Sequence, residues 1–145
     1  MFNMQIRLQD ESTDIHLDLQ RRVTLIPGDN GSGKTFLCQR IRRIQSRQPL
    51  AAEVFVVDDL EAFMCIPSCK PKVVIIDKME QYLGANDLVD MVSAVQDKYF
   101  LIFVRSGVKM PATLRDIAAL VWEHGEVDTA SLRYYWSNIQ PASNC

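Results

Sequence analysis

The residues best suited to chemistry form the glycine-rich segment GDNGSGKT, which runs from Gly28 to Thr35. The segment matches the pattern G-x-x-x-x-G-K-[S/T] at every fixed position. Triphosphate oxygens need several backbone N–H groups at once, and glycines let the chain curl closely around them. Lys34 can place its ammonium between the β- and γ-phosphates, and the hydroxyl of Thr35 can join the shell of a magnesium ion. We therefore expect a nucleoside triphosphate site that binds ATP with Mg²⁺.

The predicted nucleotide contacts extend over the whole loop and the residue that follows it. They are Gly28, Asp29, Asn30, Gly31, Ser32, Gly33, Lys34, Thr35 and Phe36. The start of the helix expected after the loop adds a partial positive charge at the same place. The alternative interpretation is a glycine-rich turn between a strand and a helix that holds no ligand.

A carboxylate at the end of an apolar run is expected to complete the magnesium site. The run VVIID at 73–77 ends in Asp77, and the run VFVVD ends in Asp58 with a similar pattern. An aspartate that follows a strand is often only a turn former. We favour Asp77, because nucleotide-binding sheets commonly have another strand before the acidic one. Thr35 and Asp77 are the predicted magnesium ligands, and Lys34 and Asp77 are predicted to take part in catalysis.

The expected strands follow from apolar alternation and from short apolar runs. Alternating apolar residues over 4–8 and 15–19 predict a hairpin. The apolar runs predict buried strands at 23–26, 54–58, 73–77 and 100–104. Two more strands are expected, one from Ala119 to Trp122 and an alternating one over 132–136.

The expected helices follow from apolar residues at helical spacing. Leu37, Ile41 and Ile44 predict an amphipathic helix over 34–47. A second helix is expected to be capped by Asn86 or Asp87, and a short third one to run from Ala112 to Ala119. Strands that alternate with helices predict the α/β class, with a mostly parallel sheet and antiparallel hairpins at the N- and C-terminal ends. With 145 residues, 48% of them apolar, we expect one domain over 1–145.

Composition limits the classes of partner. The formal net charge is −2 and the isoelectric point is near 5.6, so nucleic acid is an unlikely partner for the protein as a whole. The sequence has four cysteines and shows no secretory pattern at its start, which favours a reducing cytoplasm. No apolar run approaches the roughly 20 residues that cross a bilayer, so we expect no membrane association.

The hairpin before VTLIPGDNGSGKT, the run VVIID and the later FLIFVRS together resemble P-loop ATPases of the ABC, SMC and AAA type. The likeness spans nearly the whole chain, with Walker A at 28–35 and Walker B at 73–77. It implies the three-layer P-loop NTPase fold, with a further strand between the Walker A and Walker B strands. It also implies an ATP site at the carboxyl ends of the strands and a γ-phosphate sensor at Arg105 or Ser106.

The sequence also departs from these families. A glutamate usually follows the Walker B aspartate and polarises the attacking water, but Lys78 stands at that position. Glu80, two residues further on, is the candidate substitute and the third predicted catalytic residue. The sequence has no LSGGQ-like signature and no histidine after the 100–104 strand. The remaining length does not fit a helical lid of the AAA type. Hydrolysis is therefore left open.

Three weaker signals have simple alternatives. The arginines of the segment from Arg40 to Arg47 could dock nucleic acid or an acidic partner, although a solvated helix face is the favoured interpretation. Cys65 and Cys69 have a spacing that can bind zinc, but no second pair lies nearby in sequence. His16 and His124 have no evident acid–base partner in sequence. Four aromatic residues could stack on a base or pack the core: Trp122, Tyr134, Tyr135 and Trp136.

Three functions remain in competition. The leading one is a minimal Mg-ATP-binding protein with slow or partner-stimulated ATPase activity, acting alone, as a homo-oligomer or with a protein partner. The second is an interaction or switch module that binds nucleotide without hydrolysing it. The third is a small-molecule kinase, for which Arg105, Lys109 and Arg115 are the only residues placed to form a lid. A GTPase is disfavoured, because no N-K-x-D segment is present.

Overall fold

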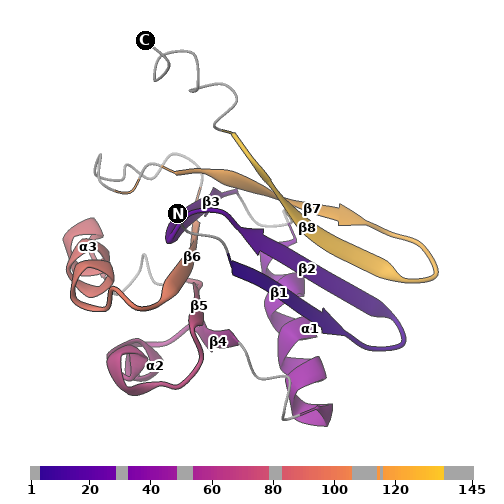
Figure 1. Cartoon of the computed structure of the whole chain (residues 1–145), viewed down its shortest axis with the longest axis horizontal. Coiled ribbons are helices and arrows are strands. Elements are labelled where there is room, and N and C mark those ends of the chain that lie inside the picture. The colour runs from indigo at the N-terminus through magenta and orange to yellow at the C-terminus, as the bar shows by residue number, and fades with distance from the viewer. Residues whose placement is uncertain are drawn as a thin grey trace.

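The computed structural model describes residues 4–28, 33–48, 54–78, 83–105, 114 and 116–135. These residues form two four-stranded sheets and three α-helices (Figure 1). The first sheet, sheet A, has the strand order β1-β2-β8-β7, and the second, sheet B, has the order β3-β6-β5-β4. The predicted site residues Gly28 and Asp77 directly follow strands of sheet B. Sheet A packs on the other side of the helix that begins at Lys34.

Sheet B is entirely parallel. Its strands are β3 (Val23–Pro27), β6 (Tyr99–Val104), β5 (Val73–Ile76) and β4 (Val54–Val57). All four residues of β5 are buried, which is typical of a parallel strand covered on both faces. The carboxyl ends of the four strands therefore lie along one edge. Strand β6 lies between β3 and β5, as the resemblance to P-loop ATPases implies.

Sheet A consists of two hairpins joined side by side. Strands β1 (Met4–Gln9) and β2 (Thr13–Leu19) are antiparallel, as are β7 (Ala118–Glu123) and β8 (Asp128–Tyr134). Strand β2 pairs with β8 in parallel. Apolar residues alternate with polar ones along β1 and β2, so one face of each strand is buried.

Helix α1 (Lys34–Arg47) packs between the two sheets. Its buried side chains share one apolar cluster with residues of β1 and β2 on one side and of β5 and β6 on the other: Leu37, Cys38, Ile41, Ile44, Ile6, Leu8, Ile15, Leu17, Val73, Ile75, Leu101 and Phe103. Val74 and Ile76 of β5 point to the opposite face of sheet B, into a second cluster. That cluster contains residues of α2 (Leu60–Met64), a 3-10 turn at Ile66–Ser68 and α3 (Ala85–Ala94). The described residues thus stack as sheet A, α1, sheet B and then the short helices.

The expected three-layer P-loop NTPase fold is wrong for this chain. The described part is strand-rich, with eight strands in two sheets and three α-helices, rather than one mostly parallel sheet between helical layers. The physical reason lies in the two hairpins. The hairpins pair with each other to form sheet A, and their apolar side chains pack against α1. They do not extend sheet B at its ends.

The two sheets meet at the start of β7. The N–H of Leu25 in β3 donates to the carbonyl of Asp116 at 2.8 Å, and Ile117 forms a parallel bridge to Leu25. The N–H of Tyr135 in turn donates to the carbonyl of Ile117 at 3.0 Å. The chain therefore leaves the edge of sheet B and continues directly into sheet A as β7.

Most predicted elements are found, but three details differ. The predicted helix from Ala112 to Ala119 is wrong at its end, because Ala118 and Ala119 pair with β8, while residues 112, 113 and 115 lie outside the described residues. Helix α2 and the 3-10 turn lie between the strands predicted at 54–58 and 73–77, where no helix was predicted. The N-cap of α3 is Gly84, whose N–H donates to the Asp87 carboxylate at 2.9 Å. None of the described helices has the length and apolar character to cross a membrane.

Candidate functional site

The predicted site residues follow the carboxyl ends of the strands in sheet B. Pro27 at the end of β3 is level with Val104 at the end of β6, and the N–H of Gly28 donates to the Val104 carbonyl at 3.0 Å. Ile76 at the end of β5 is level with Val57 at the end of β4. Glycine, arginine and aspartate residues therefore follow these ends along one edge: Gly28, Arg105, Asp77 and Asp58.

Helix α1 begins at this edge without a side-chain cap. Its N-cap residue, Gly33, has a φ of 90°, in the left-handed region that favours glycine. The first turn contains no acidic residue. The first N–H groups of a helix have no partner within it, and the helix dipole adds partial positive charge there, so this end of α1 favours an anion. Asp29, Asn30, Gly31 and Ser32 lie outside the described residues, so the nucleotide contacts predicted for them stay predictions.

Lys34 lies where β3 and β6 end. Its ammonium donates to the carbonyl oxygens of Gly28 and Val104, the latter at 3.0 Å. These two carbonyls belong to the start of the predicted loop and to the neighbouring strand. The loop lysine therefore places a positive charge at the strand edge where the phosphates were expected.

Asp77 lies directly after β5 and is only 7% exposed. Its N–H donates to the Val57 carbonyl at 2.8 Å, and its Oδ2 is 4.0 Å from the Cys38 Sγ of helix α1. Cys38 is three residues after Thr35, so the two side chains are neighbours on the helix surface. The Asp77 carboxylate therefore approaches α1 one turn beyond the exposed Thr35 hydroxyl. A shared magnesium ion stays a prediction.

Asp58, the less favoured alternative, has a different partner from Asp77. Its Oδ2 lies 3.0 Å from Nη1 of Arg42, which is a further turn along α1. The hydrogen bond from Arg42 is the largest cause of a lowered pKa for Asp58, followed by burial, which opposes it, and by the positive charges of Arg42 and Lys78. Asp58 thus forms an ion pair with the helix, while Asp77 contacts the helix one turn closer to its start.

The Cys38 thiol beside Asp77 is held in its neutral form. Burial, reinforced by the negative charge of Asp77, raises the pKa of Cys38 to about 12. A neutral thiol can donate a weak hydrogen bond to the carboxylate, whereas a thiolate would repel it. Sequence spacing offered no signal for this contact, because Cys38 lies on the buried face of the helix.

Lys78, at the position of the missing glutamate, has an unusual backbone conformation. Its φ of 61° makes it the one non-glycine residue with positive φ among those described, and its side chain is exposed. Such a conformation costs a residue with a Cβ about 1–2 kcal/mol. Arg105 directly follows Val104 and is exposed at the same edge. Glu80 and Ser106 lie outside the described residues, so their predicted roles as catalytic residue and sensor stay predictions.

Three aromatic side chains, Phe36, Trp122 and His124, form a cluster beside Gly33. The sequence alone did not indicate that Trp122 and His124 lie next to the loop. The indole N–H of Trp122 donates to the Gly33 carbonyl at 3.2 Å. The Trp122 ring lies 4.7 Å from that of Phe36 and stacks with His124, with 5.9 Å between ring centroids and 4° between planes. Arg40 places its guanidinium carbon 4.5 Å from the Phe36 centroid. Of the other aromatic candidates, Tyr134 shares a 2.7 Å hydrogen bond with Thr24, and Trp136 lies outside the described residues.

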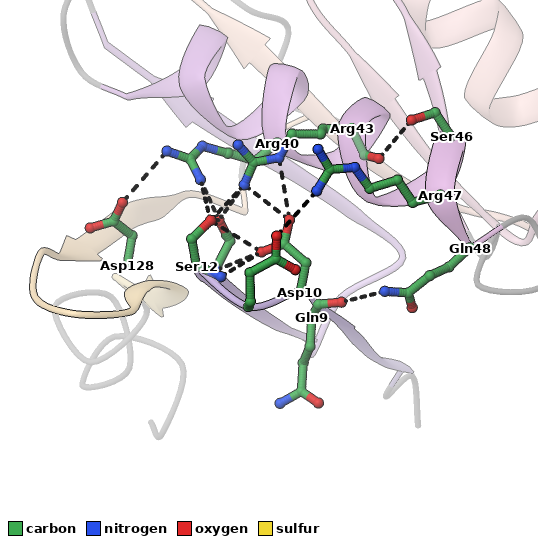
Figure 2. Close-up of polar contacts among 11 residues, drawn as sticks. Gln9, Asp10, Ser12, Arg40, Arg43, Ser46, Arg47, Gln48 and Asp128 are labelled. Carbon is green, nitrogen blue, oxygen red and sulfur yellow. Dashed lines mark hydrogen bonds and ion pairs between the residues drawn. The ribbon is translucent and has the colours of Figure 1, made fainter.

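The arginines of α1 form ion pairs and hydrogen bonds with other residues of the chain. Arg43 contacts Asp10 at 2.9 Å (Figure 2). Arg40 donates to the Thr13 hydroxyl at 2.6 Å. Ion pairs with distances of 3.7 Å, 3.0 Å and 3.3 Å join Arg40 to Asp128, Arg42 to Asp58 and Arg47 to Glu11. The favoured interpretation, a solvated helix face, is therefore wrong for Arg40 and Arg43, which anchor α1 to the turns of sheet A.

The cysteine and histidine candidates are not part of a cluster of metal ligands in the described ranges. No group of three or more His, Cys, Asp or Glu side chains that could hold a metal ion occurs within the described ranges. Cys65 ends helix α2 and is exposed, whereas the Cys69 thiol lies 3.9 Å from the Pro71 carbonyl. His16 is exposed in β2, level with Arg7.

Comparison with known proteins adds no relatives: no family model matches the chain, and no curated protein matches its sequence significantly. The function is therefore inferred from the residues and their geometry.

Proposed function

We propose that this protein binds Mg-ATP through the loop from Gly28 to Thr35. The observation that carries the proposal is the position of Lys34 at the ends of β3 and β6, at the start of an uncapped helix. Asp77 approaches the same helix one turn beyond Thr35. A cationic side chain, the N–H groups of a helix N-terminus and a carboxylate are the groups that a magnesium triphosphate requires.

In this proposal Lys34 exchanges its carbonyl partners for phosphate oxygens when the nucleotide binds. A charged phosphate is the stronger acceptor, because charge-assisted hydrogen bonds exceed those to neutral carbonyls. Thr35 supplies a hydroxyl oxygen to the metal, and Asp77 supplies a carboxylate oxygen directly or through water. The resulting protein is a slow or partner-stimulated ATPase of the cytoplasm, where the partner is a second protein or another copy of the chain.

Isothermal titration calorimetry with Mg-ATP tests the binding step. Lys34→Ala should weaken binding about 10- to 100-fold, since it removes a charge-assisted hydrogen bond of roughly 1.5–3 kcal/mol. Lys70→Ala is the matched control, because Lys70 is an exposed lysine far along the chain from the loop. Equal affinities of the wild type and Lys34→Ala would refute the proposal.

The metal ligands require a separate titration. Asp77→Asn keeps the shape of the side chain but removes its charge. We expect it to reduce the gain in ATP affinity that magnesium provides, while binding without magnesium changes little. An unchanged magnesium effect would remove Asp77 from the metal site and leave the loop as the only ligand-binding element.

A non-hydrolysing switch is the second candidate, and Lys78 is the observation that favours it. A lysine cannot act as the base that activates water at this position while it is charged. Phosphate release by the purified protein separates the two candidates. Release above background that is lost in Asp77→Ala or Glu80→Gln supports an ATPase, whereas saturable binding without release supports a switch.

A further inference from the structure

Two rings of one extended segment form a parallel stack beside the predicted phosphate loop. Trp122 and His124 are two residues apart, so their side chains lie on the same face of the chain. Their planes differ by 4° and their centroids are 5.9 Å apart. The parallel stack therefore lies at the end of β7.

The inner part of this stack is fixed to the loop and to α1. Trp122 donates its indole N–H to the Gly33 carbonyl at 3.2 Å, and Phe36, the residue after Thr35, packs against the indole. Arg40 covers Phe36 and is itself held by Thr13 at 2.6 Å. The rings nearest the loop are thus held by hydrogen bonds and packing.

His124 forms the outer end of the stack and is the accessible ring. Its side chain is 66% exposed, and its Nδ1 lies 3.1 Å from Oδ1 of Asp128. Orienting an exposed ring costs side-chain entropy and recovers little apolar burial. The ring is nevertheless held parallel to Trp122, with the Phe36 centroid 6.3 Å from its own, and its 66% exposed side chain can be reached by a flat ligand.

We propose that the purine base of the bound nucleotide stacks on the outer face of His124 and so continues the Trp122–His124 stack. The inference rests on the proposed triphosphate site, because the phosphates bring the base to this position. The stack is in direct contact with Gly33, and Phe36 directly follows the residue expected to bind magnesium. A base has a π-face whatever its hydrogen-bonding edge, and the larger purine ring gives the larger stacking area.

Calorimetric titration with Mg-ATP, Mg-CTP and magnesium tripolyphosphate tests this subsite, since tripolyphosphate carries the phosphates without a base. His124→Ala should weaken Mg-ATP binding roughly tenfold, within the range of about 1–3 kcal/mol per stacked base. Tripolyphosphate binding should be unchanged. His124→Phe should restore most of the ATP affinity, because it returns a flat ring. His16→Ala is the matched control, since His16 is the other exposed histidine.

The outcomes separate this inference from the proposed function. If the wild type binds Mg-ATP, Mg-CTP and tripolyphosphate equally, or if His124→Ala affects tripolyphosphate as strongly as Mg-ATP, the base subsite is refuted. The phosphate site would still stand as long as Lys34→Ala weakens all three. If Lys34→Ala weakens none of them, the triphosphate site itself is wrong. Thermal melting of each variant verifies that it is folded at the titration temperature.

Discussion

The indole N–H of Trp122 donates a hydrogen bond to the carbonyl oxygen of Gly33 at 3.2 Å, across 89 positions of sequence. The same carbonyl accepts the N–H of Leu37 at 3.0 Å, the first backbone hydrogen bond of α1. Sheet A therefore holds the residue at which the predicted phosphate loop becomes a helix. A change at either residue should affect both the loop and the packing of β7.

Gly33→Ala is expected to destabilise the protein by about 2 kcal/mol or more. A residue with a Cβ pays about 1–2 kcal/mol in the left-handed conformation. The new Cβ would also lie 2.6 Å from two atoms of the Trp122 ring, Cδ1 and Nε1, so the indole must move. Urea unfolding followed by circular dichroism measures the loss.

Gly125→Ala is the control for this substitution. A Cβ at Gly125 would meet its nearest neighbour, the Val127 carbonyl oxygen, at 3.8 Å, and Gly125 has no positive φ. Its effect should stay within about 0.5 kcal/mol. Similar losses for the two alanine variants would show that neither the left-handed backbone nor the indole constrains Gly33.

Lys78→Gly should stabilise the fold, although glycine is usually destabilising. Lys78 has a φ of 61°, and glycine adopts this region without the strain of a Cβ. The relief of about 1–2 kcal/mol is partly offset by the greater freedom of glycine in the unfolded chain, about 0.4–1 kcal/mol. A rise in the thermal midpoint of up to a few degrees is expected.

Lys70→Gly provides the comparison, because Lys70 is also an exposed lysine and its φ is not positive. Only the entropic cost applies there, so its thermal midpoint should fall or stay level. A fall of equal size in both variants would mean that the backbone at Lys78 stores no strain.

The elements that sequence predicted well are those specified by local periodicity. Helix α1 begins at Lys34 and ends at Arg47 as predicted, because its buried residues recur at helical spacing. Strands β5 and β6 coincide with apolar runs whose residues are nearly all buried. The local sequence pattern is enough to predict such elements, because the faces on which it places apolar residues are the faces that are buried.

The arrangement of the hairpins could not be predicted in this way. Alternation in β2 shows that one face is buried, but it does not name the partner strand. Ile15 of β2 pairs with Ala130 of β8, more than a hundred positions away. Ala118 and Ala119 are good helix formers that lie in β7, because pairing with β8 outweighs their intrinsic propensity.

The sequence indicated the candidate site residues that belong to a local motif or directly follow an apolar strand. The loop lysine and Asp77 follow from motif and strand position. The roles of Trp122, Cys38 and Arg40 depend on contacts between distant segments, and their residue types alone suggested core packing or a solvated surface. Sheet A supplies the contacts of Trp122 and Arg40, so a wrong expectation about layers also concealed those two roles. Cys38 instead contacts Asp77 at the end of a sheet B strand.

Asp10→Asn should destabilise the protein and reduce its sensitivity to acid. Burial raises the pKa of Asp10, but the N–H groups of Ser12 and Thr13 and the guanidinium of Arg43 together lower it below the ordinary 3.8. The stabilisation is thus present above pH 3.8 and is lost as pH falls through the lower folded pKa. We expect a loss of about 2 kcal/mol at pH 7, because the Asp10 side chain is 2% exposed.

Unfolding midpoints measured between neutral pH and acid verify the sign of this effect. The gap between the wild type and Asp10→Asn should narrow as the pH drops below about 4. Glu11→Gln is the control, because the Glu11 and Arg47 side chains are 80% and 56% exposed and such pairs contribute less than about 1 kcal/mol. A gap that stays constant with pH would contradict an ionised Asp10 in the turn.

The Cys38 thiol should be protected from alkylation in the folded protein. Burial and the charge of Asp77 raise its pKa from 9.0 to about 12, and the residue is 4% exposed as part of the core. Iodoacetamide reacts with the thiolate, so the exposed Cys65 should be modified first at neutral pH. Peptide mass spectrometry of native and urea-unfolded protein distinguishes the two sites. Equal labelling rates in the native protein would contradict the burial of Cys38 beside Asp77.

The same pKa shift predicts an alkaline loss of stability. Between pH 9.0 and about 12 the folded state keeps the Cys38 proton while the unfolded state releases it. Stability therefore falls as the pH rises through this interval, because the unfolded state binds fewer protons. Cys38→Ala removes the titrating group, so its unfolding midpoint should depend less on pH above 9 than that of the wild type, while Cys65→Ala should behave like the wild type. If Cys38→Ala and the wild type lose stability in parallel, the thiol is not held neutral beside Asp77.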